Sequence, residues 1–165
     1  MKLTGAERKH LAEVLRARPG DNIVICPNDG KDYIYEITAF DKESVALSFL
    51  REEDNPTEPD LYLCVYISIL KGDKTELEVQ KLTELGARRI VPMISEYTVP
   101  LREKSERLRR AAHEASKQCG RAIIPEVTDV MSYSDVIREL AGYDSAVFAY
   151  EGAYGGGLRI GDVVK

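Results

Sequence analysis

The sequence predicts an α/β protein in two parts, a small N-terminal β module and a larger domain built on a parallel sheet. In the first part, short apolar stretches flank an Asp-Gly turn, which is typical of a β-hairpin. In the second, apolar runs alternate with helical patterns. Between them the acidic segment REEDNPTEPD has two prolines and no periodicity, which indicates a linker. We therefore expect a β module at residues 1–52, a linker at 53–60 and an α/β domain at 61–165.

The N-terminal part is expected to hold one helix and three strands. GAERKHLAEVLR is an amphipathic helix, and Thr4 and Glu7 before and within it have the spacing of a capping box. Two strands follow around a turn at residues 28–30, and SVALSFL at residues 44–50 makes the third.

The second part alternates strands with helices. LYLCVYISIL, residues 61–70, is almost continuously apolar, as expected for a strand buried on both faces of a parallel sheet. A helix follows it and ends at Gly86, since glycine is common just beyond a helix. The remaining expected strands are RRIVPMIS (88–95), IIPEVT (123–128) and SAVFAY (145–150), and the remaining helices are SERLRRAAHEASKQCG (105–120) and SYSDVIRELAG (132–142).

Composition excludes some classes of function and leaves one question open. No apolar run reaches the length of a membrane span, and the N-terminus has no signal-peptide pattern. The three cysteines are widely spaced, so we expect reduced thiols in the cytoplasm and no metal site. The net charge is −5, yet residues 1–18 hold five Lys and Arg and residues 102–121 hold seven. These segments are either ordinary solvated faces or, if folding gathers them on one face, an RNA-binding surface.

The junction between the first strand of the α/β domain and its helix is one candidate site. Ligands of parallel sheets collect where strands end and helices begin. Asp73 and Thr75 have the spacing of helix caps. Lys71 and Lys74 oppose the helix dipole, so they are better explained as an anion site. Neither a P-loop nor a GxGxxG motif accompanies them.

A second candidate is the basic helix at residues 105–120 with the segment before it. Its basic side chains recur on one side of the helix, opposite the alanines, and phosphate contacts and a plain solvated face explain that side equally well. SEYTVPLR leaves the preceding strand at the sheet edge of the lysines, which places Glu96 and Arg102 beside them. The basic residues on that side are Arg107, Arg110, Lys117 and Arg121.

Three stretches in order, HLAEVLRARPGD, KGDKTELEVQKLTELGARRIVPMISEYTV and EASKQCGRAIIPEV, resemble the RsmE family of ribosomal RNA methyltransferases, of the SPOUT class. The resemblance covers residues 1 to about 150. It implies a PUA-like barrel that helps to hold rRNA and a SPOUT-type domain that binds S-adenosylmethionine. The implied activity is methylation of N3 of a uridine in 16S rRNA, by a cytoplasmic homodimer.

The resemblance also implies roles for residues that match its motifs. Glu96, if it lines the cleft, is expected to serve as the base or to orient Arg102, and Asp73 and Glu84 are expected to shape the cleft. The family's Gly-Pro-Glu-Gly-Gly loop and its later LG.RILR.ETA-like segment, which form the cofactor knot, are absent. We therefore expect the front part of such an enzyme, inactive alone, with an exposed apolar edge and no assigned cofactor ligand. The expected RNA-binding residues are Lys71, Lys74, Arg102, Gln118 and Arg121.

Two alternatives remain open from the sequence. The chain could be a non-catalytic RNA-binding module that has lost the knot, or an α/β domain with charged helix faces and no nucleic-acid partner. Binding of S-adenosylmethionine separates the first alternative from a methyltransferase, and binding of rRNA separates the second.

Overall fold

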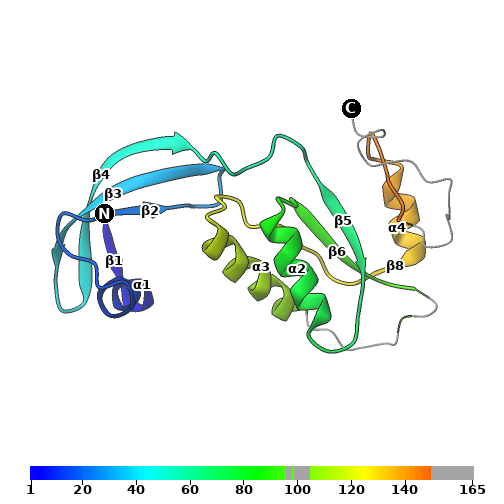
Figure 1. Ribbon diagram of the computed structural model, residues 1–165, viewed down its shortest axis with the longest axis horizontal. Coiled ribbons are helices and arrows are strands. Elements are labelled where there is room, and N and C mark those ends of the chain that lie inside the picture. The colour runs from blue at the N-terminus through cyan, green and yellow to red at the C-terminus, as the bar shows by residue number, and fades with distance from the viewer. Residues whose placement is uncertain (96–97, 99–104, 150–165) are drawn as a thin grey trace.

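The structure, a computed structural model, describes residues 1–95, 98 and 105–149. These residues form two sheets that lie one after the other along the long axis of the molecule, joined at a narrow waist (Figure 1). The N-terminal sheet is antiparallel and the second is parallel, which confirms the predicted α/β class. No helix among the described residues is long and apolar enough to span a bilayer.

The N-terminal sheet has four antiparallel strands in the order β1-β4-β3-β2. Its hydrophobic core lies between the sheet and the N-terminal helix, around Leu11, Ile37, Val45 and Leu47, each at most 6% exposed. The strands are β1 (Lys2–Thr4), β2 (Asn22–Ile25), β3 (Lys31–Phe40) and β4 (Ser44–Asp54), and the helical segment comprises α1 (Gly5–Lys9) and the π-helical turn η1 (His10–Val14).

Two local predictions for this part differ from the structure. Thr4 occupies the N-cap position of α1, but its side chain makes no capping hydrogen bond, so the predicted capping box is wrong. Strand β4 continues to Asp54, which pairs with Lys31 of β3, so the strand extends into the stretch expected to be linker. The ladder with β3 gives these acidic residues backbone partners that the local sequence does not reveal.

The parallel sheet has β5, β6 and β7 in sequence order, and β8 pairs with the later part of β6. Helices α2 and α3 follow β5 and β6, as the alternation of the sequence predicts. The elements are β5 (Cys64–Ser68), α2 (Lys74–Glu84), β6 (Arg89–Ile94), α3 (Ser105–Cys119), β7 (Glu126–Val127), β8 (Met131–Ser132) and α4 (Tyr133–Leu140).

Helices α2 and α3 pack together against the sheet and form its core. Val79 of α2, Ile90 of β6 and Leu108 and Ala112 of α3 are all fully buried. Leu108 and Ala112 are four residues apart, so they share one helix face, and the predicted apolar side of α3 is confirmed.

The predicted strand at residues 145–150 is wrong for residues 145–149, which adopt no strand, and Tyr150 lies outside the described residues. The central strand β6 has β5 on one side and β7 followed by β8 on the other. The short strand β8 was not predicted, because two residues carry no periodicity. Val147 and Phe148 are 54% and 70% exposed, in line with the expected exposed apolar edge.

Candidate nucleic-acid interface

The junction between β5 and α2 is held by a buried threonine. Thr75 is fully buried, and its Oγ1 accepts a hydrogen bond from the Leu70 amide at 2.9 Å and donates to the Leu70 carbonyl at 3.3 Å. Gly72, with φ of 70°, makes the turn between them. The predicted cap role of Thr75 is therefore wrong, since its hydroxyl ties the end of the strand to the helix.

Asp73 occupies the N-cap position of α2, but its side chain caps no backbone amide. Instead its carboxylate accepts a hydrogen bond from Nη2 of Arg107 at 2.8 Å, and Nε of Arg107 lies 2.5 Å from Oε1 of Glu76. The hydrogen bond that Arg107 donates to Asp73 and the charge of Glu76 raise the pKa of Arg107. Arg107 therefore joins the starts of α2 and α3, and its charge is already balanced within the protein.

Lys71 and Lys74 flank this ion-pair cluster and are exposed. Within the described part of the chain, neither ammonium group takes part in an ion pair. A cation at a helix N-terminus gains nothing from the dipole, so a phosphate in contact with both lysines and with the backbone amides would stabilise this arrangement. Their role as phosphate contacts stays a prediction.

Glu84 lies far from the lysines. Lys74 begins α2 and Glu84 ends it, which separates them by about 15 Å along the helix axis. Glu84 accepts hydrogen bonds from Lys81 at 2.8 Å and Gln80 at 2.9 Å. Gln118 is exposed near the end of α3. The predicted residues therefore do not form one cluster.

Arg121 requires a correction, because the structure places it in the interior. Its side chain is 2% exposed, and its guanidinium pairs with Glu58 at 2.8 Å. Nη1 also donates to the carbonyls of Thr83 at 3.1 Å and Ala87 at 2.7 Å. A phosphate cannot reach a guanidinium that is buried and already bonded, so Arg121 is not an RNA contact. The pattern of bases on α3 could not reveal this, because Glu58 is distant in sequence.

The other two predicted residues, Glu96 and Arg102, lie outside the described residues. Their roles as base and phosphate contact therefore stay predictions.

A groove of about 340 Å³ lies between the outer faces of α2 and α3. Leu77, Ala111 and Ala115 form its apolar part. The polar part is acidic or neutral, and it comprises Asp73, Glu76, Gln80, Glu114 and Gln118. This chemistry is unsuited to a phosphate, so the groove is not part of the nucleic-acid interface.

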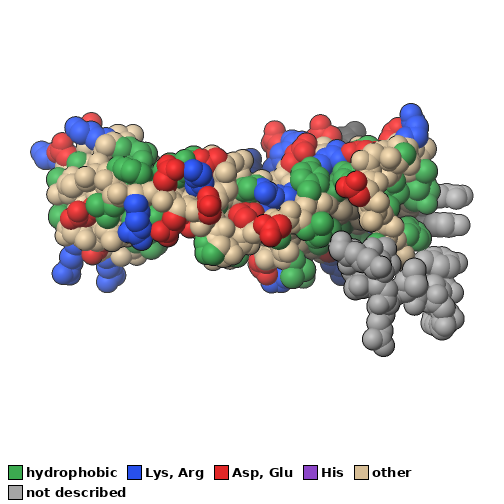
Figure 2. All heavy atoms as spheres, turned by 90° about the horizontal axis from the view of Figure 1, so that it is seen from above, with side chains coloured by type: hydrophobic (Ala, Val, Ile, Leu, Met, Phe, Trp, Pro, Cys, Tyr) green, Lys and Arg blue, Asp and Glu red, His purple; other side chains and the backbone are tan. Residues whose placement is uncertain are grey.

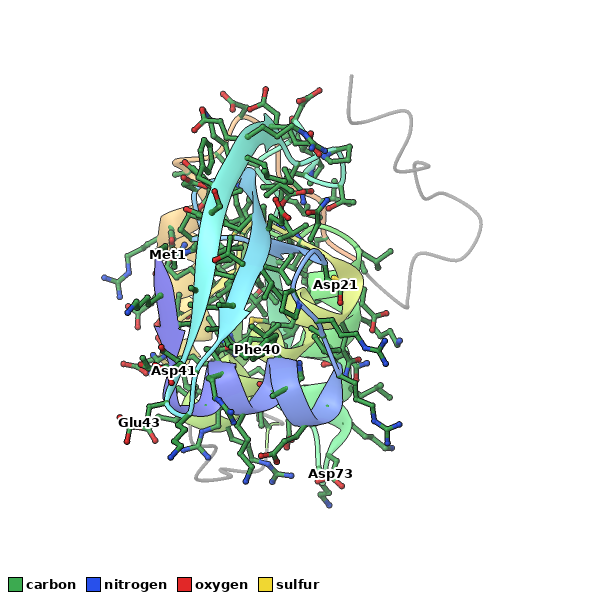
Figure 3. The ribbon with its side chains drawn as sticks, turned by 90° about the vertical axis from the view of Figure 1, so that its left-hand side faces the viewer. Met1, Asp21, Phe40, Asp41, Glu43 and Asp73 are labelled. Atoms are coloured by element: carbon green, nitrogen blue, oxygen red, sulfur yellow. The ribbon has the colours of Figure 1, made fainter. Side chains whose placement is uncertain are left out.

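The N-terminal helix and the start of α2 lie on one side of the long axis of the molecule. Helix α1 and the loop that leads into α2 both lie on the lower side in Figure 1. Figure 3, along the long axis, shows Asp73 projecting on the same side as the N-terminal helix. Figure 2 views the opposite side, where acidic side chains gather around the waist. Exposed acids at this waist include Asp29, Glu52, Glu53 and Asp54.

The N-terminal helix adds basic side chains to the lower side. Lys9 is exposed, and Arg16 and Arg18 are exposed just beyond the helix. Arg8 is half-buried and donates to the carbonyl of Asp41 at 3.3 Å. The sequence indicated these basic residues only through the excess of Lys and Arg in residues 1–18. The helix that carries these bases lies on the same side of the molecule as the loop that holds Lys71, and acids such as Asp41, Glu43 and Asp73 lie on that side too (Figure 3).

Two protein-family models match the chain, the first over the N-terminal sheet and the second over the parallel sheet. Residues 3–50 match an RNA methyltransferase PUA domain, and residues 57–158 match an RNA methyltransferase domain. The PUA match confirms the PUA-like nature predicted for the N-terminal sheet.

Two curated relatives that resemble the chain share the same name. The chain is 31% identical over 155 residues to ribosomal RNA small subunit methyltransferase E of Bacillus subtilis, and covers 60% of that protein with 90% of its own length. It is 28% identical over 142 residues to the protein of that name from Synechocystis, with 85% of the chain and 46% of the relative covered. The chain thus spans about half the length of these relatives.

Solved structures agree with the sequence relatives. Ribosomal RNA small subunit methyltransferase E from Neisseria gonorrhoeae, bound to S-adenosylmethionine, superimposes with a TM-score of 0.74 at 28% identity, over 83% of this chain and 58% of that one. A putative methyltransferase from Legionella pneumophila with bound cofactor gives a TM-score of 0.70 at 26% identity, over 84% and 60%. Since the methyltransferase-domain match alone covers residues 57–158, well over half of the sequence, the chain belongs to the RsmE family of RNA methyltransferases.

Proposed function

We propose that this chain serves the methylation of N3 of a uridine in 16S rRNA of the small ribosomal subunit, with S-adenosylmethionine as methyl donor. The supporting relatives are ribosomal RNA small subunit methyltransferases E, and one neighbour of that name is bound to S-adenosylmethionine. The observation that carries the proposal is the pair of exposed lysines, Lys71 and Lys74, at the start of α2, on the side of the molecule where the N-terminal helix also lies (Figures 1 and 3). These lysines give an acidic chain a place at which an RNA phosphate can bind.

The lining of the α2–α3 groove does not suit S-adenosylmethionine. The α2–α3 groove is lined by acids and amides, with no cation to pair with the methionine carboxylate. We therefore assign no described residue to the cofactor. When bound, the cofactor supplies the methyl group, and the role proposed for this chain's described residues is to hold the RNA.

The chemistry of the target defines what these residues must do. N3 of uracil carries a proton in the neutral base and lies on the Watson–Crick edge, so the base must leave its stack and lose that proton. In this scheme Lys71 and Lys74 hold flanking phosphates, and Glu96 takes the proton. Replacement of Glu96 by Gln should abolish methyl transfer while RNA binding persists; an active Glu96→Gln enzyme would exclude this base.

A methylation assay tests the proposal directly. An enzyme of the relatives' full length that contains this chain is incubated with small ribosomal subunits and S-adenosylmethionine that carries a labelled methyl group, and the rRNA is then read by primer extension. Methylation at N3 blocks base pairing, so reverse transcriptase should stop at one uridine. RNA binding by that enzyme without label transfer would instead favour the non-catalytic RNA-binding module.

Filter binding at increasing salt tests the RNA-holding role. Log affinity falls as log salt rises, and loss of two phosphate contacts should make this negative slope shallower by roughly 1.4, at about 0.7 per contact for single strands. The variant is Lys71→Gln with Lys74→Gln. The matched control is Lys31→Gln at the acidic waist, where Lys31 already pairs with Glu52 at 2.7 Å. Equal slopes for the double variant and the control would refute the lysine contacts.

We also propose that the protein is a cytoplasmic homodimer. The support is the group of exposed apolar side chains before β5 and after α4, on which a second copy could pack. These side chains include Leu61 and Tyr62, at 53% and 59% exposure, and Val147 and Phe148. Light scattering after size exclusion checks the assembly, and a monomer at high concentration would contradict it.

A further inference from the structure

The segment between the two sheets is bound to both of them. Asn55, at the end of β4, is 8% exposed, and Glu58, three residues later, has a side chain that is 9% exposed. A flexible tether would leave such polar groups in solvent. The buried side chains of Asn55, Glu58 and Arg121, which we call the waist clamp, are held by hydrogen bonds to both domains.

Glu58 fastens the segment to the α/β domain. Both carboxylate oxygens accept from Arg121, at 2.8 and 3.3 Å, and Oε1 also accepts from the Ile123 amide at 2.9 Å. Burial alone would raise the pKa of Glu58, but the hydrogen bonds from Arg121 and Ile123 outweigh it and the pKa lies below its usual value. Arg121 in turn bonds to the end of α2 through the Thr83 carbonyl.

Asn55 connects the two domains through one amide group. Its Nδ2 donates to both carboxylate oxygens of Asp32 in β3, at 2.9 and 3.0 Å, and to the carbonyl of Gly120 after α3, at 3.0 Å. Its backbone amide donates to Gly30 at 3.0 Å. Two charge-assisted contacts on one side and one contact on the other leave little freedom of rotation between the sheets.

A further contact crosses the waist directly. The side chain of Asn28, in the β2–β3 turn, accepts a hydrogen bond from the Ile124 amide at 2.6 Å. The β2–β3 turn, the segment after β4 and the turn after α3 therefore meet at one place, as the narrow region of Figure 1 shows.

We propose that the waist clamp holds the two sheets at one fixed angle, so that the exposed bases of the N-terminal helix and of the start of α2 act as a single two-part grip on rRNA. Asn55, Glu58 and Arg121 are then positioning residues, which act on RNA through the lysines and arginines they align. The RNA part of this inference rests on the proposed function, whereas the fixed angle does not. Two weak surfaces held in register bind more tightly than the same surfaces on a tether, because less freedom is lost on binding.

NMR relaxation of backbone amides in the RNA-free chain tests the fixed angle. In the unmodified chain, amides of β3 and of β6 should fit one common rotational diffusion tensor. In Glu58→Gln and Asn55→Ala, the two sheets should need separate tensors, while chemical shifts inside each sheet stay in place. Asn55→Ala leaves no buried charge, so it remains informative if Glu58→Gln fails to fold. The control is Glu52→Gln, which removes an exposed carboxylate paired with Lys31.

RNA affinity supplies the second readout. Loss of the clamp should weaken binding of a 16S rRNA fragment by about tenfold, the scale expected for ordering a few groups on binding. The salt slope should stay unchanged, because the phosphate contacts themselves are intact. A single tensor in Asn55→Ala and in any folded Glu58→Gln would overturn the fixed-angle inference, and separate tensors with unchanged affinity would overturn the grip. If the unmodified chain binds no rRNA, the proposed function and the grip both fail while the relaxation result still decides the clamp.

Discussion

Gly86, just after α2, provides the sharpest test of how the waist is packed. Its φ is 94°, a backbone conformation that side chains rarely adopt. A methyl group at this position would lie 2.9 Å from Cγ and 3.3 Å from Cδ of Pro59. The proline ring cannot move aside like a long side chain, so Gly86→Ala should strain both the backbone and the contact with the segment after β4.

The expected cost follows from these two terms. The left-handed conformation costs an alanine about 1–2 kcal/mol, and overpacking against a rigid neighbour costs about 1–3 kcal/mol. Alanine also lowers the conformational entropy of the unfolded chain, which stabilises the folded protein by about 0.4–1 kcal/mol. The free energy of unfolding should therefore fall by about 1–5 kcal/mol, which corresponds to a fall of roughly 2–20 °C in Tm for a chain of this length.

Urea unfolding followed by far-UV circular dichroism measures the effect, and Pro59→Ala separates its two causes. Pro59→Ala removes the two close ring atoms, so the double variant should keep the backbone strain but lose the clash. We expect a coupling free energy of about 1–3 kcal/mol, with the double variant more stable than the sum of the single changes predicts. Additive effects, within about 0.5 kcal/mol, would mean that Pro59 does not pack on Gly86.

Three further predictions concern the core, the clamp and a helix cap. Leu108→Ala empties a fully buried site among α2, α3 and β6 and should lower the free energy of unfolding by about 2–5 kcal/mol in urea titration; a loss under 1 kcal/mol would contradict that packing. Because the folded pKa of Glu58 lies below its usual 4.5, its contribution to stability is present above that value and is lost as the pH falls. Urea midpoints between pH 7 and pH 3 should therefore vary less in Glu58→Gln, and an unchanged profile would argue against the buried pair. Ser132 Oγ accepts from the Asp135 amide at 3.2 Å, so Ser132→Ala should cost about 0.5–2 kcal/mol, whereas Ser132→Gly should cost only a few tenths. Equal stability of Ser132→Ala and the unmodified chain in thermal melts would exclude the cap.

Local patterns predicted most of the elements. The spacing of Leu108, Ala112 and Ala115 placed the buried side of α3, and the Asp-Gly turn placed the β2–β3 hairpin. Periodicity succeeds here because one face of each element is buried and the other is solvated. It failed for β8 and for residues 145–149, because short strands depend on a partner that lies elsewhere in the chain.

The candidate site divides in the same way. The structure places both lysines, exposed, at the start of α2, where the sequence marks them as exceptions to dipole preference, and their phosphate contacts stay a prediction. The caps proposed for Asp73 and Thr75 were wrong, because an arginine from α3 and the backbone of Leu70 compete for their oxygens. Capping spacing shows which bond a side chain can make, and tertiary neighbours decide which one it does make.

By itself, the sequence determined the α/β class, the order of most elements, the family and the excess of bases in two segments, because these depend on composition, periodicity and motifs along the chain. Only the tertiary structure decided which charges face solvent. It buried Arg121 against Glu58, engaged Arg107 with Asp73 and Glu76, and left the α1 side and the start of α2 on one side of the molecule. The physical reason is that the ion-pair partner of a charged side chain lies many residues away in the sequence. Local spacing therefore predicts neither that partner nor the burial of the side chain.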